Sequence, residues 1–356
     1  MCASHRQKVF FYGQPRKLSS RGRSLNKEAF MDAQILDILG LLVFGFILLV
    51  KGADWFVEGA AGIADKLGVP QLIIGLTIVA MGTSAPETAI SLTATMHGSA
   101  DLAVGNIIGS NIINVLVILG ITAIITPLAV QKCTMRYEMP FVIVISVIFM
   151  LLGLGTGVLK GLSAPDGVLS RSCGIILLIL FVAYLAYLFV MVKRGEAEAE
   201  EVPDGKNTSW IKLIFLLLVG LALVVLGSNY TINSATKLAR LFGISERIIG
   251  LTIVALGTSL PELATCIAAA LKKNADIAIG NIVGSNIFNM LFVGGVSATI
   301  RNLPYQGGFF ADSIVCILTA VLLLLCVVLT KKKTLNRAGG IIMLCAYAGY
   351  FVYLIK

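Results

Sequence analysis

Charged residues are scarce in this sequence. Of 356 residues only 13% are Asp, Glu, Lys or Arg, whereas 57% are hydrophobic, and the mean hydropathy is +0.93. A soluble domain of this size is about one-quarter charged, so the composition excludes an ordinary water-soluble enzyme or binding domain. Apolar runs that reach or approach the roughly 18 residues of a membrane span occur at 35–50, 141–158, 175–192 and 314–329. We therefore predict an all-α polytopic membrane protein.

Ligands for soft metals are also scarce. The only histidines are His5 and His97, and the seven cysteines are scattered without a CxxC spacing. Such cysteines are typical of packing residues rather than of a disulfide framework or a zinc site. The net charge of +9 lies mostly in short loops, where basic residues set membrane topology, so it does not indicate nucleic-acid binding.

A cleavable signal peptide is absent. Residues 1–30 contain seven basic residues and no apolar h-region. We expect this segment to be a basic, disordered extension that precedes the membrane domain.

The dominant feature of the sequence is an internal repeat. "GLTIVAMGTSAPETA" begins at Gly75 and "GLTIVALGTSLPELA" at Gly250, while "GNIIGSNIINVL" begins at Gly105 and "GNIVGSNIFNML" at Gly280. Every pair is offset by 175 residues, and 26 of the 46 positions from Gly75 to Gly120 are identical to their partners. The chain therefore consists of two related halves.

Each half contains five hydrophobic segments. The predicted spans are 34–67, 71–97, 101–125, 139–159 and 172–192 in the first half, and 210–242, 246–271, 276–300, 311–330 and 338–355 in the second. Because five is odd, the halves must enter the bilayer in opposite orientations, and inverted repeats of this kind place a binding site between the halves. We predict ten transmembrane helices in two inverted repeats, 31–192 and 210–356, joined by a cytoplasmic linker at 193–209.

The distribution of basic residues predicts the orientation. With the residue-31 end outside, the inside loops hold more Lys and Arg than the outside loops. The basic residues before Met31 favour the opposite orientation, a conflict that disappears if residues 1–30 are upstream of the natural start.

The repeated GTSxPE motif places a carboxylate within an apolar segment, where a charged side chain is energetically unfavourable. A charged side chain at the bilayer centre costs roughly 2.5–3.5 kcal/mol, yet Glu87 and Glu262 occur at matched positions, each directly after a proline. The preceding Thr and Ser lie four and three residues earlier, respectively, and share a helix face with the glutamate. Because proline lacks an N–H, each helix should break here and present hydroxyls, free carbonyls and a carboxylate at one level.

The second repeated motif adds oxygen and amide groups. Polar residues follow i, i+4, i+8 spacing and form one stripe in each half: Asn106, Ser110 and Asn114, and Asn281, Ser285 and Asn289. The intervening Asn111 and Asn286 face away from the stripe and are interpreted as packing groups. The GxxxG glycines of the same motif are explained by close helix packing.

Together these motifs indicate a site for a hard cation. All the donors are oxygens, which suits Na⁺, Ca²⁺ or Mg²⁺ and not zinc or copper. Two carboxylates match one divalent or two monovalent ions, so one site could hold either kind in turn. Asp54 and Glu58 lie one helical turn apart and could form a vestibule or a solvated face.

The paired "GTSAPE…GNIIGSNIIN" and "GTSLPE…GNIVGSNIFN" segments resemble the repeats of the cation/calcium exchanger superfamily, in particular the prokaryotic sodium/calcium exchangers. The resemblance extends from Met31 to the C-terminus. It implies antiport of Na⁺ against Ca²⁺ by alternating access, with the first and sixth helices sliding as gates.

The resemblance also implies roles for individual residues. Glu87 and Glu262 would be the central shared ligands, helped by Thr83 and Thr258. The flanking Na⁺ sites would be lined by Ser84, Ser110, Ser259 and Ser285 with the carbonyls of Ala80 and Ala255, and the centre would be completed by Asn114 and Asn289. Potassium-dependent relatives carry aspartate where Asn289 stands, so K⁺ is not expected to be co-transported.

Other functions remain open from the sequence. A Ca²⁺/H⁺ antiporter on the same fold could use the two glutamates as proton carriers, and a passive cation channel is a further alternative. An intramembrane enzyme is disfavoured because no nucleophile–base pair is repeated at the motifs. We expect no cofactor beyond the transported ions, no obligatory protein partner, and a place in a prokaryotic inner membrane.

Overall fold

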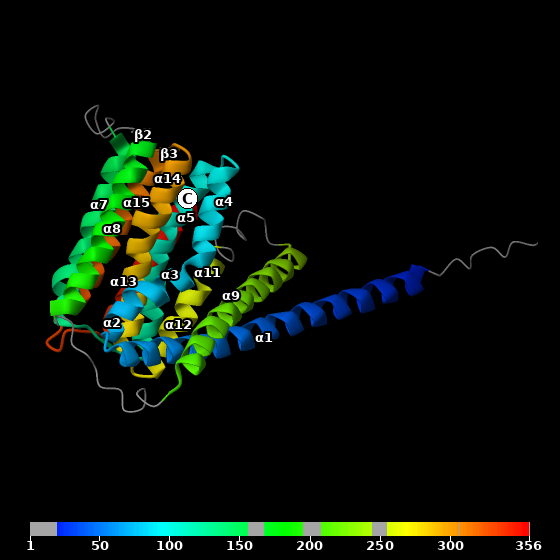
Figure 1. Cartoon of the computed structure of the whole chain (residues 1–356). Helices are drawn as coiled ribbons and strands as arrows, with labels where there is room; N and C mark the ends of the chain where they lie inside the picture. Colours follow the sequence, from blue (N-terminus) through cyan, green and yellow to red (C-terminus); the bar gives the residue numbers. More distant parts are fainter. Residues whose placement is uncertain (1–19, 156–166, 195–207, 244–254, 306, 356) are drawn as a thin grey trace, which may run out of the picture.

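The computed structural model describes residues 20–155, 167–194, 208–243, 255–305 and 307–355. It is a helical bundle beside which two long helices, α1 (Ser20–Leu67) and α9 (Trp210–Leu241), lie side by side and oblique to the others (Figure 1). The remaining helices of the first half are α2 (Gln71–Ile74), η1 (Gly75–Val79), α3 (Ala80–Thr83), α4 (Ala85–Met96), α5 (Ala100–Ile113), η2 (Asn114–Leu119), α6 (Gly120–Ile125), η3 (Thr134–Glu138), α7 (Met139–Leu154) and α8 (Arg171–Arg194). Those of the second half are α11 (Ala255–Thr258), α12 (Leu260–Leu271), α13 (Ala275–Phe288), η7 (Asn289–Val293), α14 (Gly294–Ile300), α15 (Gly307–Val328) and α16 (Arg337–Ile355).

The prediction of an all-helical polytopic membrane fold is confirmed. Within the described residues, eight helices are long and apolar enough to cross a membrane, and the bent pair 71–83 and 85–96 supplies a ninth. The expected span at 246–271 lies partly outside the described residues, which begin again at Ala255, so the count of ten stays a prediction.

Helix α1 begins at Ser20, so it includes residues 20–30 of the segment expected to be a basic extension, and the boundary of that extension at residue 30 stays a prediction. Residues 1–19 and most of the expected linker at 193–209 lie outside the described residues. The segment 20–30 contains no proline and a single glycine, so nothing local prevents the apolar helix from continuing toward its N-terminus.

Glycines spaced seven residues apart bring α1 and α9 into close contact. A Cβ at Gly52 would lie 2.6 Å from the Val224 backbone nitrogen, and a Cβ at Gly227 would lie 2.5 Å from the Leu49 nitrogen. Contacts move toward lower numbers on α9 as they move toward higher numbers on α1, so the two helices run antiparallel. Small residues that allow backbones to touch are the usual basis of helix association in membranes.

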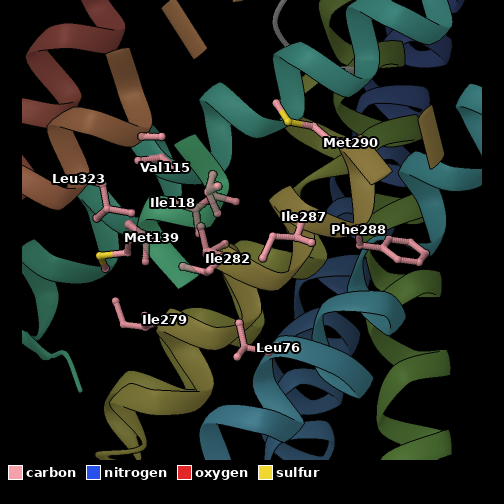
Figure 2. Packing of buried hydrophobic residues seen from close by; sticks show 14 of the residues in the cluster. Leu76, Val115, Ile118, Met139, Ile279, Ile282, Ile287, Phe288, Met290 and Leu323 are labelled. Atoms are coloured by element: carbon pink, nitrogen blue, oxygen red, sulfur yellow. The ribbon is translucent and has the colours of Figure 1, made fainter. Parts of the chain in front are cut away.

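The two copies of the GNxxGSN segment occupy the centre of the bundle. In the most apolar stretches, 78% of 101–125 and 94% of 275–300 are buried, compared with 22% of α1 and 17% of α16. Figure 2 shows the packing around α13, where Ile279, Ile282 and Ile287 meet side chains from η1, η2, α7 and α15. The peripheral helices therefore face lipid, and the repeated motifs face protein.

Two short strand pairs, which were not expected from the sequence, tie loops of the two halves together. β1 (Leu128–Ala129) pairs antiparallel with β4 (Thr334–Leu335). β2 (Gly167–Leu169) pairs antiparallel with β3 (Leu303–Tyr305).

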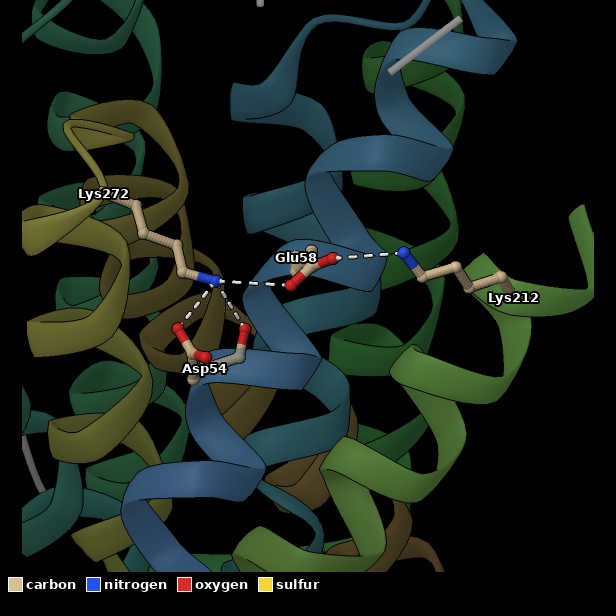
Figure 3. A network of polar contacts seen from close by, with 4 residues as sticks. All are labelled: Asp54, Glu58, Lys212 and Lys272. Carbon is tan, nitrogen blue, oxygen red and sulfur yellow. Dashed lines mark hydrogen bonds and ion pairs between the residues drawn. The ribbon is translucent and has the colours of Figure 1, made fainter. Parts of the chain in front are cut away.

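An ion-pair network joins three helices at one end of the bundle (Figure 3). Lys272, at the C-terminal end of α12, lies 2.8 Å from an oxygen of the Asp54 carboxylate and donates to the Asp54 backbone carbonyl at 2.7 Å. Glu58 lies 4.0 Å from both Lys272 and Lys212. The four side chains are between 30% and 62% exposed, so the network is partly solvated rather than buried.

Candidate cation site

Both GTSxPE motifs break their helices at the serine, as expected. The backbone of Ser84 has φ −79° and ψ 11°, and that of Ser259 has φ −91° and ψ 9°. The segments 71–83 and 85–96 meet at 49°. The proline then occupies the first turn of the new helix, where a missing N–H costs nothing. The glutamate follows in that same first turn.

Each serine donates a hydrogen bond to the glutamate of the other half. Ser84 Oγ lies 2.9 Å from Glu262 Oε1, and Ser259 Oγ lies 3.0 Å from Glu87 Oε1. The two carboxyl groups are 2% and 1% exposed, and each contacts the serine that lies three residues before the other glutamate. Residues 175 positions apart in sequence therefore meet in one buried place through reciprocal contacts.

Four buried oxygens of the repeated motifs have no hydrogen-bond partner within the described part of the chain. They are Oε2 of Glu87 and Glu262 and Oδ1 of Asn114 and Asn289. In the described part of the chain, neither glutamate forms an ion pair with lysine or arginine. Buried polar oxygens are normally satisfied, and here unpartnered oxygens occur at matched positions of the two halves. Carboxylate and amide oxygens are the donors that hard cations prefer.

The polar stripe of α13 contacts the broken helix of the first half. Thr83 Oγ1 donates to Asn281 Oδ1 at 3.0 Å, and Ser285 Oγ donates to the Ala80 carbonyl at 3.4 Å. In the first half, Asn106 Nδ2 donates to the Glu87 carbonyl at 3.1 Å. The stripes thus hold the backbone of the first half's broken helix at Ala80 and Glu87.

Three further residues predicted to bind the ions are Thr258, Ser110 and Ala255. Thr258 is buried and directly precedes Ser259, which donates to Glu87. Ser110 is buried on α5, between Asn106 and Asn114. Ala255 is the first residue of α11, and its side chain lies outside what the structure describes.

The sequence analysis missed two features of the site. Asn111 and Asn286, interpreted as packing groups, hydrogen-bond to each other's backbone across the two halves. In addition, π-helical turns begin at the matched positions Asn114 and Asn289, and such turns are frequent at functional sites. The repetition of asparagine at both GSN positions was the available signal for the first feature. No residue pattern predicted the second.

Comparison with known proteins is consistent with this geometry. The model of the family "Sodium/calcium exchanger protein" matches residues 38–190 and 212–356. The inner membrane protein YrbG of Escherichia coli is 39% identical over 295 residues, which cover 79% of this chain and 87% of the relative. The sodium/calcium exchanger MaX1 of Methanosarcina acetivorans is 29% identical over 343 residues, which cover 88% of this chain and 97% of the relative.

Solved structures give the same result. A structure of the sodium-calcium exchanger NCX_Mj, soaked with 10 mM Na⁺, superposes with a TM-score of 0.75 at 33% identity, covering 89% of this chain and 99% of that chain. The class of protein is thus a multi-pass membrane cation antiporter of the exchanger type. The chain belongs to the sodium/calcium exchanger family, within its prokaryotic members.

Proposed function

We propose that the protein exchanges Na⁺ for Ca²⁺ across the membrane by alternating access, without co-transport of K⁺. The observation that carries the proposal is the reciprocal pair of hydrogen bonds that brings Glu87 and Glu262 into one buried place. The twelve residues proposed to bind the ions are Thr83, Ser84, Glu87, Ser110, Asn114, Thr258, Ser259, Glu262, Ser285 and Asn289, with the carbonyls of Ala80 and Ala255.

The charge of this site provides the basis for exchange. Two carboxylates supply −2, which one Ca²⁺ or two Na⁺ neutralise, so binding of one kind of ion excludes the other. A buried uncompensated charge is strongly unfavourable. The conformational change that turns the site from one side of the membrane to the other is therefore disfavoured when no ion is bound. Obligatory exchange follows from this penalty.

We propose that the two halves are inverted repeats, 31–192 and 210–356, with α1 and α9 as a moving pair. Their antiparallel arrangement supports this, because matched helices of inverted repeats run in opposite directions. Alternating access would then be a movement of this pair against the rest of the bundle. We further propose that the residue-31 end lies outside a prokaryotic inner membrane and that the linker at 193–209 is cytoplasmic.

Ion coupling is tested with purified protein in proteoliposomes. Vesicles loaded with Na⁺ are diluted into Na⁺-free buffer at constant pH, and ⁴⁵Ca²⁺ uptake is measured while a permeant ion clamps the voltage. We expect uptake only with an outward Na⁺ gradient, with no effect of K⁺ or of a protonophore. Uptake that follows a pH gradient and ignores Na⁺ would instead establish the Ca²⁺/H⁺ antiporter, and uptake without any counter-ion would establish a channel.

The neutral residue at position 289 is expected to set ion preference. The variant Asn289→Asp adds a third carboxylate to a site that two carboxylates already balance. We expect it to fold, to exchange Ca²⁺ more slowly by about tenfold because the bound ion leaves less readily, and to show a changed dependence on K⁺. The measurement is ⁴⁵Ca²⁺ exchange with Na⁺ or with mixed Na⁺ and K⁺, and unchanged rates in both conditions would contradict the proposed role of Asn289.

We expect the Lys272 network to affect the exchange rate, because it links α12 to the moving pair α1 and α9. Lys272 joins α12 to Asp54 of α1, so Lys272→Gln removes a tie between the bundle and the pair. Partly exposed ion pairs contribute about 0–1 kcal/mol, so folding should survive while the exchange rate at saturating ions changes by up to about fivefold. The adjacent, exposed Lys273 supplies the control, Lys273→Gln. Equal rates in the two variants would show that the network has no role in the cycle.

A further inference from the structure

Four asparagines form a closed amide network between the centres of the two halves. Asn111 Nδ2 donates to the Asn286 backbone carbonyl at 3.1 Å, and Asn286 Nδ2 donates to the Asn111 carbonyl at 3.3 Å. Asn114 Nδ2 donates to Asn286 Oδ1 at 3.1 Å, and Asn289 Nδ2 donates to Asn111 Oδ1 at 3.3 Å. All four side chains are at most 2% exposed.

The network fixes which way each amide points. A side-chain amide has an NH₂ group on one side and an oxygen on the other, and turning it over exchanges donor for acceptor. If Asn111 turned over, it would lose its bond to the Asn286 carbonyl and would offer NH₂ to the NH₂ of Asn289. The same holds for Asn286 with respect to Asn114. The backbone carbonyls, which can only accept, therefore determine the orientation of all four side chains.

The network also determines the direction in which the side-chain oxygens of Asn114 and Asn289 point. Because their NH₂ groups are held by the opposite half, their Oδ1 atoms must point away from Asn286 and Asn111. Both of these amide oxygens are buried and have no hydrogen-bond partner among the residues that the structure describes. Asn111 and Asn286 are not themselves among the residues proposed to bind ions.

We infer that Asn111 and Asn286 are positioning residues, which hold the amide oxygens of Asn289 and Asn114 toward the cation. This inference rests on the proposed function. It also explains why an amide suits position 289, since aspartate there would place an acceptor against the oxygen of Asn111. A purely structural role, in which the asparagines join helices as polar residues often do in membranes, predicts no specific pairing of 111 with 289.

A double-mutant cycle separates the two roles. Equilibrium binding of ⁴⁵Ca²⁺ at constant pH is measured for purified Asn111→Ala, Asn289→Ala and the double variant. We expect each single change to weaken Ca²⁺ binding by about tenfold, in keeping with the loss of one hydrogen bond or ligand, and the double variant to bind no more weakly than Asn289→Ala alone. The control is Asn111→Ala combined with Asn114→Ala, whose losses should multiply because Asn114 is held by Asn286.

Each outcome decides a separate question. If the unaltered protein binds no Ca²⁺, the proposed function fails, and the inference fails with it. If the unaltered protein binds Ca²⁺ but the losses multiply equally for the pairs 111/289 and 111/114, the inference is overturned while the proposed function stands. If Asn111→Ala does not fold, the matched pair Asn286→Ala and Asn114→Ala supplies the same test in the other half.

Discussion

Replacing either Glu87 or Glu262 with glutamine is expected to abolish exchange. The substitution preserves size and the oxygen that accepts from serine, but removes one of two negative charges. With a charge of −1 remaining, the site no longer balances a divalent ion. We expect the rate of Na⁺-driven ⁴⁵Ca²⁺ uptake to fall at least about 100-fold, equivalent to about 2.7 kcal/mol.

The control for this loss is Asp101→Asn, which removes one negative charge from an exposed side chain outside the site. Membrane insertion and monodispersity should be unchanged for all three variants. Because Ser84 bonds to Glu262 and Ser259 to Glu87, the two site variants should be equally inactive. Full exchange by either one would refute the assignment of a shared site.

Replacing Gly284 with valine is expected to disrupt the bundle at the site. A Cβ at Gly284 would lie 2.6 Å from the Leu76 carbonyl oxygen and 2.8 Å from the Ala80 Cβ. Both contacts belong to the segment that carries Ala80 and Thr83 to the site, so the added side chain must push this segment away. Overpacking of a dense core costs about 1–3 kcal/mol, and occasionally more. We expect a lower melting temperature and loss of Ca²⁺ uptake.

A matched control is Gly349→Val on the exposed face of α16, where nothing lies within 4 Å of the added Cβ. Thermal unfolding monitored by size-exclusion chromatography should be unchanged for this variant. If Gly284→Val melted and transported like Gly349→Val, the close contact between α13 and the broken helix would be wrong.

The sequence predicted those features that local chemistry determines. The proline of the GTSxPE motif predicted a helix break at the motif in both halves, and the apolar runs predicted where most of the spans lie. The 175-residue offset paired Glu87 with Glu262, and their meeting in one place follows from that duplication. The i, i+4, i+8 spacing placed Asn281 and Ser285 on one stripe, and the structure shows that this stripe contacts the broken helix of the other half.

Features that depend on how the halves contact each other could not be predicted from the sequence. Helical periodicity placed Asn111 and Asn286 away from the stripe, but it could not indicate that the opposite half lies there with carbonyls to accept from them. The seven-residue glycine spacing on α1 and α9 was visible, but its meaning depends on which helix it meets.

The most direct test of the central claim is the number of Ca²⁺ ions bound per chain. Equilibrium ⁴⁵Ca²⁺ binding to the purified protein should give one ion per chain that is displaced by Na⁺, and both Glu87→Gln and Glu262→Gln should abolish this single binding event. Two independent Ca²⁺ ions per chain, each lost in only one of the two variants, would show that each half has its own site and would contradict the account.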